Sequence, residues 1–441
     1  MSRHLERVRR SLLCIVLTAG CFEPPCESAS EPGGPFIPCA TPSFDAGRRD
    51  GGIDAGVMDA GRVDAGRVDA GRGDAGVVDA GRVDAGFDAG VLPTSDAGVR
   101  VVDFGLVSGR DGGFARDFVV PIEPSDEGFL IEVLGVSPEL DVFQTTRIVS
   151  PRGVVLAQGR DVQQHRTRSR PNLRLANALV LESDDARGEW APGAWRFRVE
   201  SWMPTVDTAA TVKVYVKPRP PPGVQRVGLN LFFTGSAGLT AATAPTQPRL
   251  VGALRGLQAL FLDAGIAVDP PRLVDLPPGF SAVTSRIDED AGLPMVGTSL
   301  EVLFQQSRGA PQGLNLFFVE SLELDPRLPP GSVLGVAGGV PGTTMTNGTG
   351  SSGVAILFDE ATFVPRMGEA DPLGLVLTHE VGHQLGLSHV FELDGEQDNL
   401  SDTPRSGAAA EANIMAPFAA GGSQWSPLQG VTLRRNPVVR P

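Results

Sequence analysis

The sequence predicts an α+β domain in its C-terminal half, preceded by an all-β sandwich domain and a disordered tether. Three patterns lead to this fold class: an Asp-Ala-Gly repeat, a series of short β-branched and aromatic runs, and alternating strand and helix patterns towards the C-terminus. We divide the chain accordingly into a leader (1–20), a tether (21–99), a β-sandwich domain (100–217), a linker (218–223) and a C-terminal domain (224–441).

Composition limits the classes of partner. With 441 residues the chain is long enough for two or three domains. Its formal charge of −14 argues against nucleic acid as a partner. All four cysteines lie within the first 39 residues, so a body held together by disulfides is excluded. At most Cys26 and Cys39 could close one small loop, in an oxidising compartment.

The N-terminus has the pattern of an export signal. Four arginines precede a short apolar run, and Leu17-Thr18-Ala19-Gly20-Cys21 then ends in small residues and a cysteine. This resembles a bacterial lipoprotein signal, which implies cleavage before Cys21 and lipidation of its thiol. Phe22 at the next position favours an anchor in the outer membrane or at the cell surface. Ordinary signal cleavage that leaves Cys21 free is the alternative.

The segment that follows is repetitive. From Asp45 to Gly98 the unit Asp-Ala-Gly recurs with a two-residue spacer, a period that matches neither helix nor strand. Glycine in every unit raises the entropic cost of ordering, and the few valines cannot offset it. We predict a flexible tether. A calcium-binding repeat is the weaker alternative, because the paired glycines of calcium rolls are missing.

Residues 100–217 read as strands. Runs such as 118–122, 129–133, 195–199 and 212–216 are rich in β-branched and aromatic residues, and Gly and Pro separate them at intervals typical of an antiparallel sandwich. A stiff, Pro-rich linker follows. In the C-terminal domain, 227–233, 314–319 and 354–358 are strand candidates, and a helix begins at Pro248 with its apolar residues on one face.

A cluster of histidines carries the chemistry. Asp371 and Pro372 suit the start of a helix that runs to about Leu385. His379 and His383 are four residues apart, so their imidazoles project from one face of this helix, as two ligands of one metal must. Glu380 lies beside them and can reach a water molecule on the metal.

A third ligand follows the helix. Gly386 can adopt the left-handed conformation that ends a helix, and the chain then turns so that His389 can approach the same metal. Three neutral imidazoles and a water form the open site of a catalytic Zn2+, with Glu380 as general base. A structural zinc would have a closed fourth position and no need for Glu380.

These residues carry a resemblance to a known family. His379-Glu380-x-x-His383-x-x-Gly386-x-x-His389 matches the metzincin signature, and Asn413-Ile414-Met415-Ala416-Pro417 is similar to the metzincin Met-turn, with Met415 as a floor under the histidines. The C-terminal domain is therefore expected to be metzincin-like. Within the clan it looks most like the pappalysin-like peptidases, on the residues Asp398 to Pro404 and Ser426 to Gln429. The resemblance implies that the strand at 354–358 pairs with an extended substrate.

The chain departs from the family's pattern in two ways: it lacks the cysteines that the family usually has in this domain, and it lacks a tyrosine after the Met-turn methionine. Where the family usually has tyrosine, two residues after the Met, this chain has Pro417, and its only tyrosine is Tyr215. The oxyanion is then stabilised by another group or by zinc alone.

An acidic loop follows the third histidine and contains Asp394, Glu396, Asp398 and Asp402. It is either a Ca2+ site, with Asp398 and Asp402 as ligands, or a solvated turn.

Together these patterns predict a zinc-dependent endopeptidase, a hydrolase that acts on polypeptide outside the cytoplasm and is held by a lipid anchor in a bacterial membrane. A narrow-specificity processing enzyme is a variant of this reading. The alternative from another class is a surface-anchored binding or adhesion lipoprotein with a weak or inactive metallo-domain. The intact Glu380 and three histidines argue against that alternative.

Overall fold

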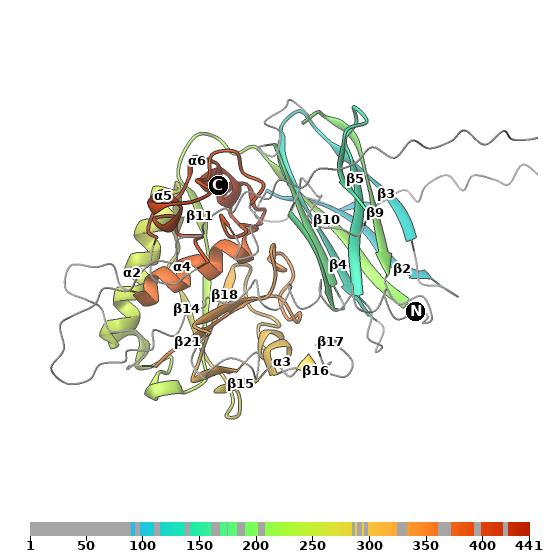
Figure 1. Cartoon of the computed structure of the whole chain (residues 1–441). Coiled ribbons are helices and arrows are strands. Elements are labelled where there is room, and N and C mark those ends of the chain that lie inside the picture. The colour runs from blue at the N-terminus through green and yellow to red at the C-terminus, as the bar shows by residue number, and fades with distance from the viewer. Residues whose placement is uncertain are drawn as a thin grey trace, which may run out of the picture. The chain divides into compact units, whose positions relative to one another are not determined.

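The computed structural model describes most of the chain after residue 89 (Figure 1). The predicted leader, Cys21 and nearly all of the predicted tether lie outside the described residues. In the part of the chain that is described, no helix is long and apolar enough to cross a membrane. The described residues are 90–92, 98–109, 115–136, 142–159, 168–173, 175–182, 190–201, 208–284, 287–288, 293–294, 299–323, 333–359, 372–391, 398–417 and 422–441.

The first domain is built from antiparallel strands. Ten of them join in the order β1-β2-β10-β4-β8-β7-β5-β9-β3, with β6 beside β5. Their bounds are β1 Gly90–Leu92, β2 Arg100–Gly109, β3 Ala115–Ile122, β4 Asp126–Gly135, β5 Val142–Val149, β6 Val155–Gln158, β7 Arg168–Leu173, β8 Leu175–Leu181, β9 Gly193–Ser201 and β10 Thr208–Pro218.

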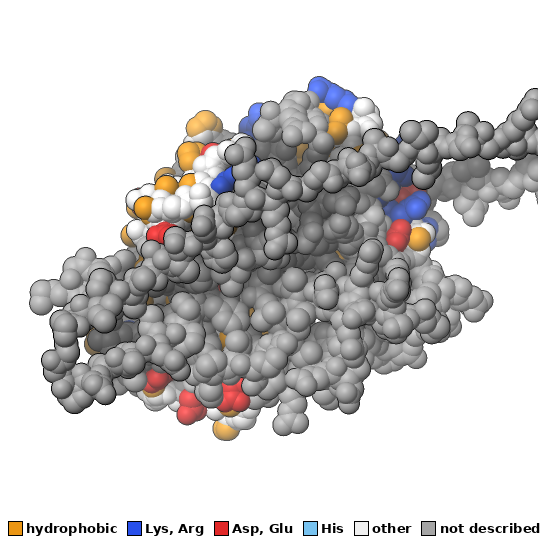
Figure 2. All heavy atoms as spheres, viewed as in Figure 1, with side chains coloured by type: hydrophobic (Ala, Val, Ile, Leu, Met, Phe, Trp, Pro, Cys, Tyr) orange, Lys and Arg blue, Asp and Glu red, His pale blue; other side chains and the backbone are white. Residues whose placement is uncertain are grey.

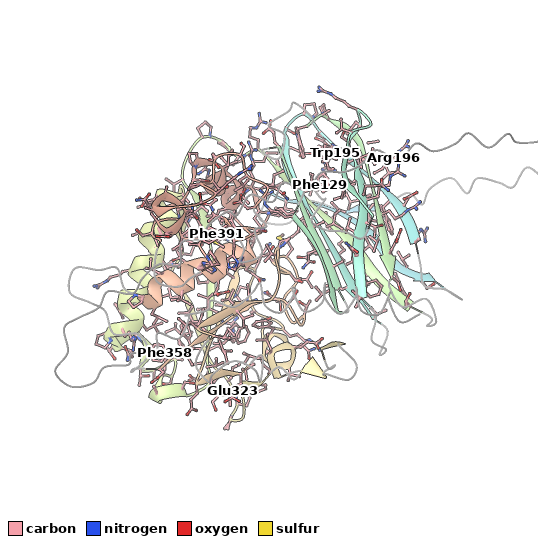
Figure 3. All side chains as sticks on the ribbon, in the orientation of Figure 1. Phe129, Trp195, Arg196, Glu323, Phe358 and Phe391 are labelled. Carbon is pink, nitrogen blue, oxygen red and sulfur yellow. The ribbon has the colours of Figure 1, made fainter. Side chains whose placement is uncertain are left out.

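These strands form two layers around one core. Figure 1 shows β4 and β10 in one layer and β5, β9 and β3 in the other. Inward side chains of both layers form a single apolar cluster. Within it the rings of Phe129 and Trp195 (Figure 3) meet edge to face with centroids 5.6 Å apart. Phe118 stacks on Phe197 with centroids 5.1 Å apart. Alternate residues of β3 and β9 face solvent. The predicted β-sandwich is confirmed.

The second domain is mixed α/β. Its strands are β11 Gln225–Val227, β12 Leu229–Phe233, β13 Ile266–Val268, β14 Arg272–Asp275, β15 Ala282–Thr284, β16 Ile287–Asp288, β17 Leu293–Pro294, β18 Leu314–Val319, β19 Ser321–Glu323, β20 Gly335–Ala337 and β21 Val354–Leu357. Its helices are α2 Pro248–Asp263, α3 Ser299–Gln305, α4 Pro372–Gln384, α5 Ala408–Glu411 and α6 Pro427–Arg435, and two short 3-10 turns cover Ser236–Gly238 and Ala244–Thr246. The predicted α+β domain is confirmed.

A five-stranded sheet forms the centre of this domain, in the order β14-β12-β18-β21-β20. β12, β14, β18 and β21 are parallel, and β20 is antiparallel at one end. β12 and β18 are buried along their whole length, which explains why both read as unbroken apolar runs. Phe232 stacks on Phe317 across these two strands at 4.5 Å.

The sheet order corrects one expectation. β21 lies between β18 and β20, so both of its backbone edges are already hydrogen-bonded. The strand at Val354–Leu357 therefore cannot pair with a substrate, as the family resemblance implied. The strand that ends the sheet is β20, Gly335–Ala337, a three-residue segment too short to show a periodic pattern.

Helix α2 matches the predicted helix from Pro248. The Gln247 side chain caps it by accepting hydrogen bonds from the backbone N–H of Arg249 and Leu250. α2 and α4 cross closely, because Gly374 of α4 has no side chain there. A Cβ at Gly374 would lie 3.0 Å from the carbonyl oxygen of Ala253. α2 thereby fixes the position of α4.

The described surface carries both signs of charge. Figure 2 shows acidic side chains along the lower edge of the second domain, where Figure 3 labels Glu323 of β19, and basic side chains mainly at the upper and right-hand edges. On this face the described residues form no continuous basic surface.

The α2–α4 crossing gives a test of the packing. Gly374→Ala should lower the free energy of unfolding by about 1–3 kcal/mol, because its Cβ meets backbone atoms that cannot yield. Gly256→Ala, on the facing side of α2, should be neutral or stabilise by about 0.5–1 kcal/mol, since its Cβ would meet nothing closer than 3.8 Å. Urea unfolding of both variants measures the difference, and equal midpoints would contradict the description of this contact.

Candidate metal centre

Helix α4 carries the predicted motif. It begins at Pro372, as expected, and the predicted cap Asp371 lies outside the described residues. The helix ends at Gln384, and Gly386 then adopts a φ of 107°, a left-handed value that favours glycine. Nearly every residue of α4 is buried, the polar ones included. Buried polar side chains normally have hydrogen-bond partners, so we expect specific partners for those of α4.

The structure brings the three histidines together. His379 and His383 lie one turn apart on α4, and His389 reaches them from the segment after Gly386. The Nε2 atom of His389 lies 3.2 Å from Nε2 of His379 and 3.1 Å from Nε2 of His383. All three side chains are almost completely buried. Among the described residues they form the one group of three or more side chains that could hold a metal ion.

Backbone carbonyls orient two of the rings. The Nδ1 atom of His379 lies 2.7 Å from the carbonyl oxygen of Ile414, and Nδ1 of His383 lies 2.7 Å from that of Leu387. A carbonyl only accepts, so Nδ1 carries the proton in both rings and Nε2 keeps its lone pair. Burial, and then the neighbouring His389, lowers the pKa of His379 to about 3. Its imidazole is therefore neutral near pH 7.

These residues fit a zinc ion. Their three ligand atoms lie within 4.8 Å of one another, and the lone pairs of two of them are fixed by Nδ1 hydrogen bonds. Lone pairs held so close repel one another unless a cation lies between them. Three imidazole nitrogens with one position left for water are the donor set of catalytic zinc. The predicted Zn2+ site is confirmed as a three-histidine centre of the metzincin type.

Glu380 lies on α4 beside the first histidine and is completely buried. Its side chain packs against Gly335 of β20: a Cβ there would lie 2.6 Å from Cγ and 3.0 Å from Oε1 of Glu380. The carboxylate thus occupies space that a side chain on the edge strand would fill. No sequence pattern predicts this contact, because Gly335 is 45 residues away and belongs to no recognised motif.

Met415 lies under the same helix. The side chain is fully buried, and a Cβ at Gly382 would lie 2.6 Å from its sulfur. Its carbonyl accepts a hydrogen bond from Val390 N at 3.0 Å, next to the third histidine. Phe391, one residue further on, packs against the catalytic core (Figure 3). Met415 therefore packs against α4 at Gly382, and its role as a floor under the three histidines stays a prediction.

Gln429 of α6 is a supporting residue that sequence reasoning missed. Its amide and that of Asn413 bond each other in both directions, at 2.8 and 3.0 Å. Asn413 Oδ1 also accepts from Met415 N, so the pair holds the turn whose Ile414 carbonyl orients His379. One signal was available: Ser426 and Gln429 form a capping box, a recognisable Ser-x-x-Gln pattern at a helix start.

The two predicted calcium ligands lie in different surroundings. Asp402 accepts from Ser426 Oγ and Leu428 N at the start of α6. Asp398 Oδ1 accepts from Leu400 N and Thr403 Oγ1, and burial raises the pKa of Asp398 to about 6. Asp394 and Glu396 lie outside the described residues. The Ca2+ site stays an untested prediction, and what the structure shows is Asp402 acting at a helix N-terminus.

This geometry defines a class: two histidines one turn apart, a third after a left-handed glycine, a neighbouring glutamate and a Met-turn make a metzincin zinc metallopeptidase. Residues 336–417 match a protein-family model, Peptidase M43, described as pregnancy-associated plasma protein-A. The matched segment contains Glu380, the three histidines and Met415, so the zinc-binding motif of this chain is similar to that of the M43, pappalysin-like family. A comparison with curated proteins finds no match.

Two solved structures show low similarity. Metalloproteinase-II from Bacteroides fragilis is 11% identical with a TM-score of 0.29, over 48% of this chain and 54% of that one. The chain thus spans about half the length of that protein. The N-terminal xylanase 10B modules from Clostridium thermocellum are 10% identical with a TM-score of 0.11, over 52% of this chain and 41% of that one. At these TM-scores neither neighbour informs the site.

The Gly335 contact predicts a loss of activity without a loss of metal. In Gly335→Ala the new methyl group must push the Glu380 side chain aside, so cleavage of casein should fall at least about tenfold, given that a positioned general base contributes roughly 10²–10⁴-fold. Zinc content should stay at the wild-type level, because no histidine is touched. Gly256→Ala, a Gly-to-Ala change with room for its Cβ, is the control. Unchanged cleavage in Gly335→Ala would contradict the contact.

Proposed function

We propose that this protein is an extracytoplasmic zinc endopeptidase that cleaves extended polypeptide and is held to a bacterial membrane through Cys21. The observation that carries the peptidase part is Glu380, which lies between the three-histidine centre and the edge strand β20. A structural zinc site has no use for a buried carboxylate in this position.

Glu380 is the residue that moves protons. Zinc, when bound by the three histidines, acidifies water and polarises the carbonyl of the scissile bond. The Glu380 carboxylate accepts the proton of the attacking water and later gives it to the nitrogen of the leaving amine. Glu380 is fully buried with Gly335 of β20 against its side chain, so the carboxylate is held away from bulk water.

The edge strand is where a polypeptide would bind. β20 ends the central sheet and Gly335 places its backbone directly against Glu380. A substrate in extended conformation that adds to this edge would pair through backbone hydrogen bonds and run past the general base. Such binding selects for an unfolded or flexible segment rather than for one particular side chain.

Stabilisation of the oxyanion falls to the metal in this proposal. Pro417 occupies the position where the family usually has tyrosine. The only tyrosine of the chain, Tyr215, is buried in the sandwich, where its hydroxyl lies 3.1 Å from Thr346 Oγ1. Tyr215 is therefore engaged in packing and does not supply the missing hydroxyl.

Removing the general base gives the decisive test of the peptidase. The mature full chain and its Glu380→Gln variant should both bind about one zinc per chain, whereas casein cleavage by the variant should fall by about 10²–10⁴-fold. Glu323→Gln, an exposed acid on β19, is the matched control and should cleave normally. Zinc in all three proteins without cleavage of casein by wild type would favour either the binding-lipoprotein alternative or a narrow-specificity processing enzyme, and cleavage of a peptide library would separate these two.

The membrane anchor is tested separately. Cys21→Ser removes the thiol that a lipid would modify, so the protein should move from the membrane fraction to the soluble fraction after expression in a bacterium that processes lipoproteins. Cys26→Ser is the control and should stay with the membrane. An unchanged distribution of Cys21→Ser would refute lipidation at Cys21 and leave the peptidase proposal intact.

A further inference from the structure

The sandwich domain buries a carboxylate outside its own core. Glu132 of β4 is 1% exposed. One of its oxygens accepts from Thr344 N at 3.1 Å and Met345 N at 2.9 Å, and the other accepts from Thr346 Oγ1 at 2.8 Å. All three donors belong to the segment 338–353 that connects β20 to β21, which we call the hairpin loop. A carboxylate is costly to bury unless its acceptors are satisfied, so these contacts are specific.

Residues around Glu132 make further polar and apolar contacts with the hairpin loop. Its cross-strand neighbour Asn177 has its amide 3.2 Å from Thr343 Oγ1, and Tyr215 reaches Thr346. Apolar side chains complete the surface: Val99, Leu130, Leu179, Leu181 and Tyr215 cluster together, with Met345 of the hairpin loop packed against them. This face of β4, β8 and β10 would be polar if it faced water. Its apolar character indicates permanent cover.

The hairpin loop in turn holds the end of the active-site helix. Gly342 N donates to the carbonyl oxygen of Gln384 at 3.0 Å. The Gln384 side chain donates back, to Thr343 O at 3.3 Å and to Ser351 O at 3.1 Å. Gln384 directly follows His383, the second zinc ligand. Any shift of the hairpin loop is therefore transmitted to the last turn of α4.

The sandwich also contacts the turn between the zinc ligands. A Cβ at Gly386 would lie 2.9 Å from Leu179 Cδ2 and 3.1 Å from Arg168 Cδ. Arg168 further donates to Thr432 Oγ1 of α6 at 3.2 Å. The sandwich thus supports both the helix end and the segment that leads to His389.

A buried lysine of the sandwich makes a further set of contacts, with the end of α6 and the residues that follow it. Lys217, the last-but-one residue of β10, is 2% exposed and donates to the carbonyl oxygens of Asn436 at 3.3 Å and Val439 at 2.6 Å, as well as to that of Arg434. These carbonyls belong to the last turn of α6 and to the residues just after it, where a helix leaves its acceptors without partners of its own. α6 carries Gln429, which holds the Met-turn.

We propose that the β-sandwich is a fixed part of the peptidase rather than a removable propeptide or an independent binding module, and that Glu132 is a positioning residue that sets the hairpin loop against α4. The inference rests on the proposed peptidase activity, and it extends the active unit to the whole of residues 98–441. Detaching the sandwich would leave the amides of Thr344 and Met345 without their acceptor and uncover the apolar cluster.

Two variants of Glu132 in the full chain test the positioning role. Glu132→Gln keeps the shape and can still accept from both backbone amides and donate to Thr346 Oγ1, so it should keep near wild-type kcat. Glu132→Ala leaves both amides unpaired, so kcat on casein should fall roughly ten- to hundredfold with KM little changed, since misplaced groups lose rate rather than binding. Glu123→Gln, an exposed acid on the same domain, is the control.

Hydrogen exchange provides a readout that does not depend on catalysis. In Glu132→Ala the amides of 338–353 and of the end of α4 should exchange faster, while the far layer β3–β9 should not change. Thr346→Val removes the hydrogen bonds of its hydroxyl with Glu132 and Tyr215 but leaves the amides of Thr344 and Met345 paired. It should show a weaker form of the same pattern and covers the case in which the alanine variant does not fold. Wild-type rates and wild-type exchange in both variants would overturn the proposal.

Cutting the linker tests whether the sandwich is fixed. A protease site inserted between Pro222 and Gly223 should be cleavable, and the two fragments should still elute together with full activity. A C-terminal fragment that separates and stays active would overturn the inference without touching the peptidase assignment. If wild type cleaves nothing, the peptidase proposal fails. Hydrogen exchange and co-elution of the fragments still decide whether the sandwich is a fixed part of the protein.

Discussion

Three neutral imidazoles held with their lone pairs towards one point are the constraint on which the rest of this domain depends. The lone pairs repel one another unless a cation lies between them. Other parts of the protein must therefore hold each ring in place through its Nδ1 atom. The carbonyl of Ile414 does this for His379 and the carbonyl of Leu387 for His383. Neither carbonyl belongs to α4. The geometry of the centre is therefore only as precise as the turns around it.

Support for those turns continues outward in a connected series of contacts. Gln429 holds the Met-turn through Asn413, Lys217 holds the chain after α6, and Glu132 holds the hairpin loop that binds Gln384. Two of these three side chains come from the sandwich. The sequence suggests two domains joined by a stiff linker. Among the described residues, these contacts join the two domains into one unit around the metal centre.

The local patterns of the sequence were predictive, and the non-local contacts were not. The helix with His379 and His383, the Gly386 turn and the α2 helix follow from 3.6-residue periodicity and capping, which act within a few residues. The edge strand was assigned to the wrong segment because strand order depends on partners far along the chain. Gly335 contacts Glu380 across 45 residues, Gln429 contacts Asn413 across 16, and Glu132 contacts Thr344 across 212. Of the three only Gln429 lies in a short-range pattern, its capping box, and that pattern does not reveal the contact with Asn413.

Glycines lie at three close contacts of α4: Gly335 meets Glu380, Gly342 meets Gln384, and Gly382 of the helix itself makes room for Met415. At each position even a methyl group would displace a residue next to the metal. Substitutions at these three glycines are therefore not available for changing the cleavage preference. Diversification among relatives should instead accumulate at the rim and in surface loops, and a laboratory library aimed at altered specificity would waste its variants if it included these glycines.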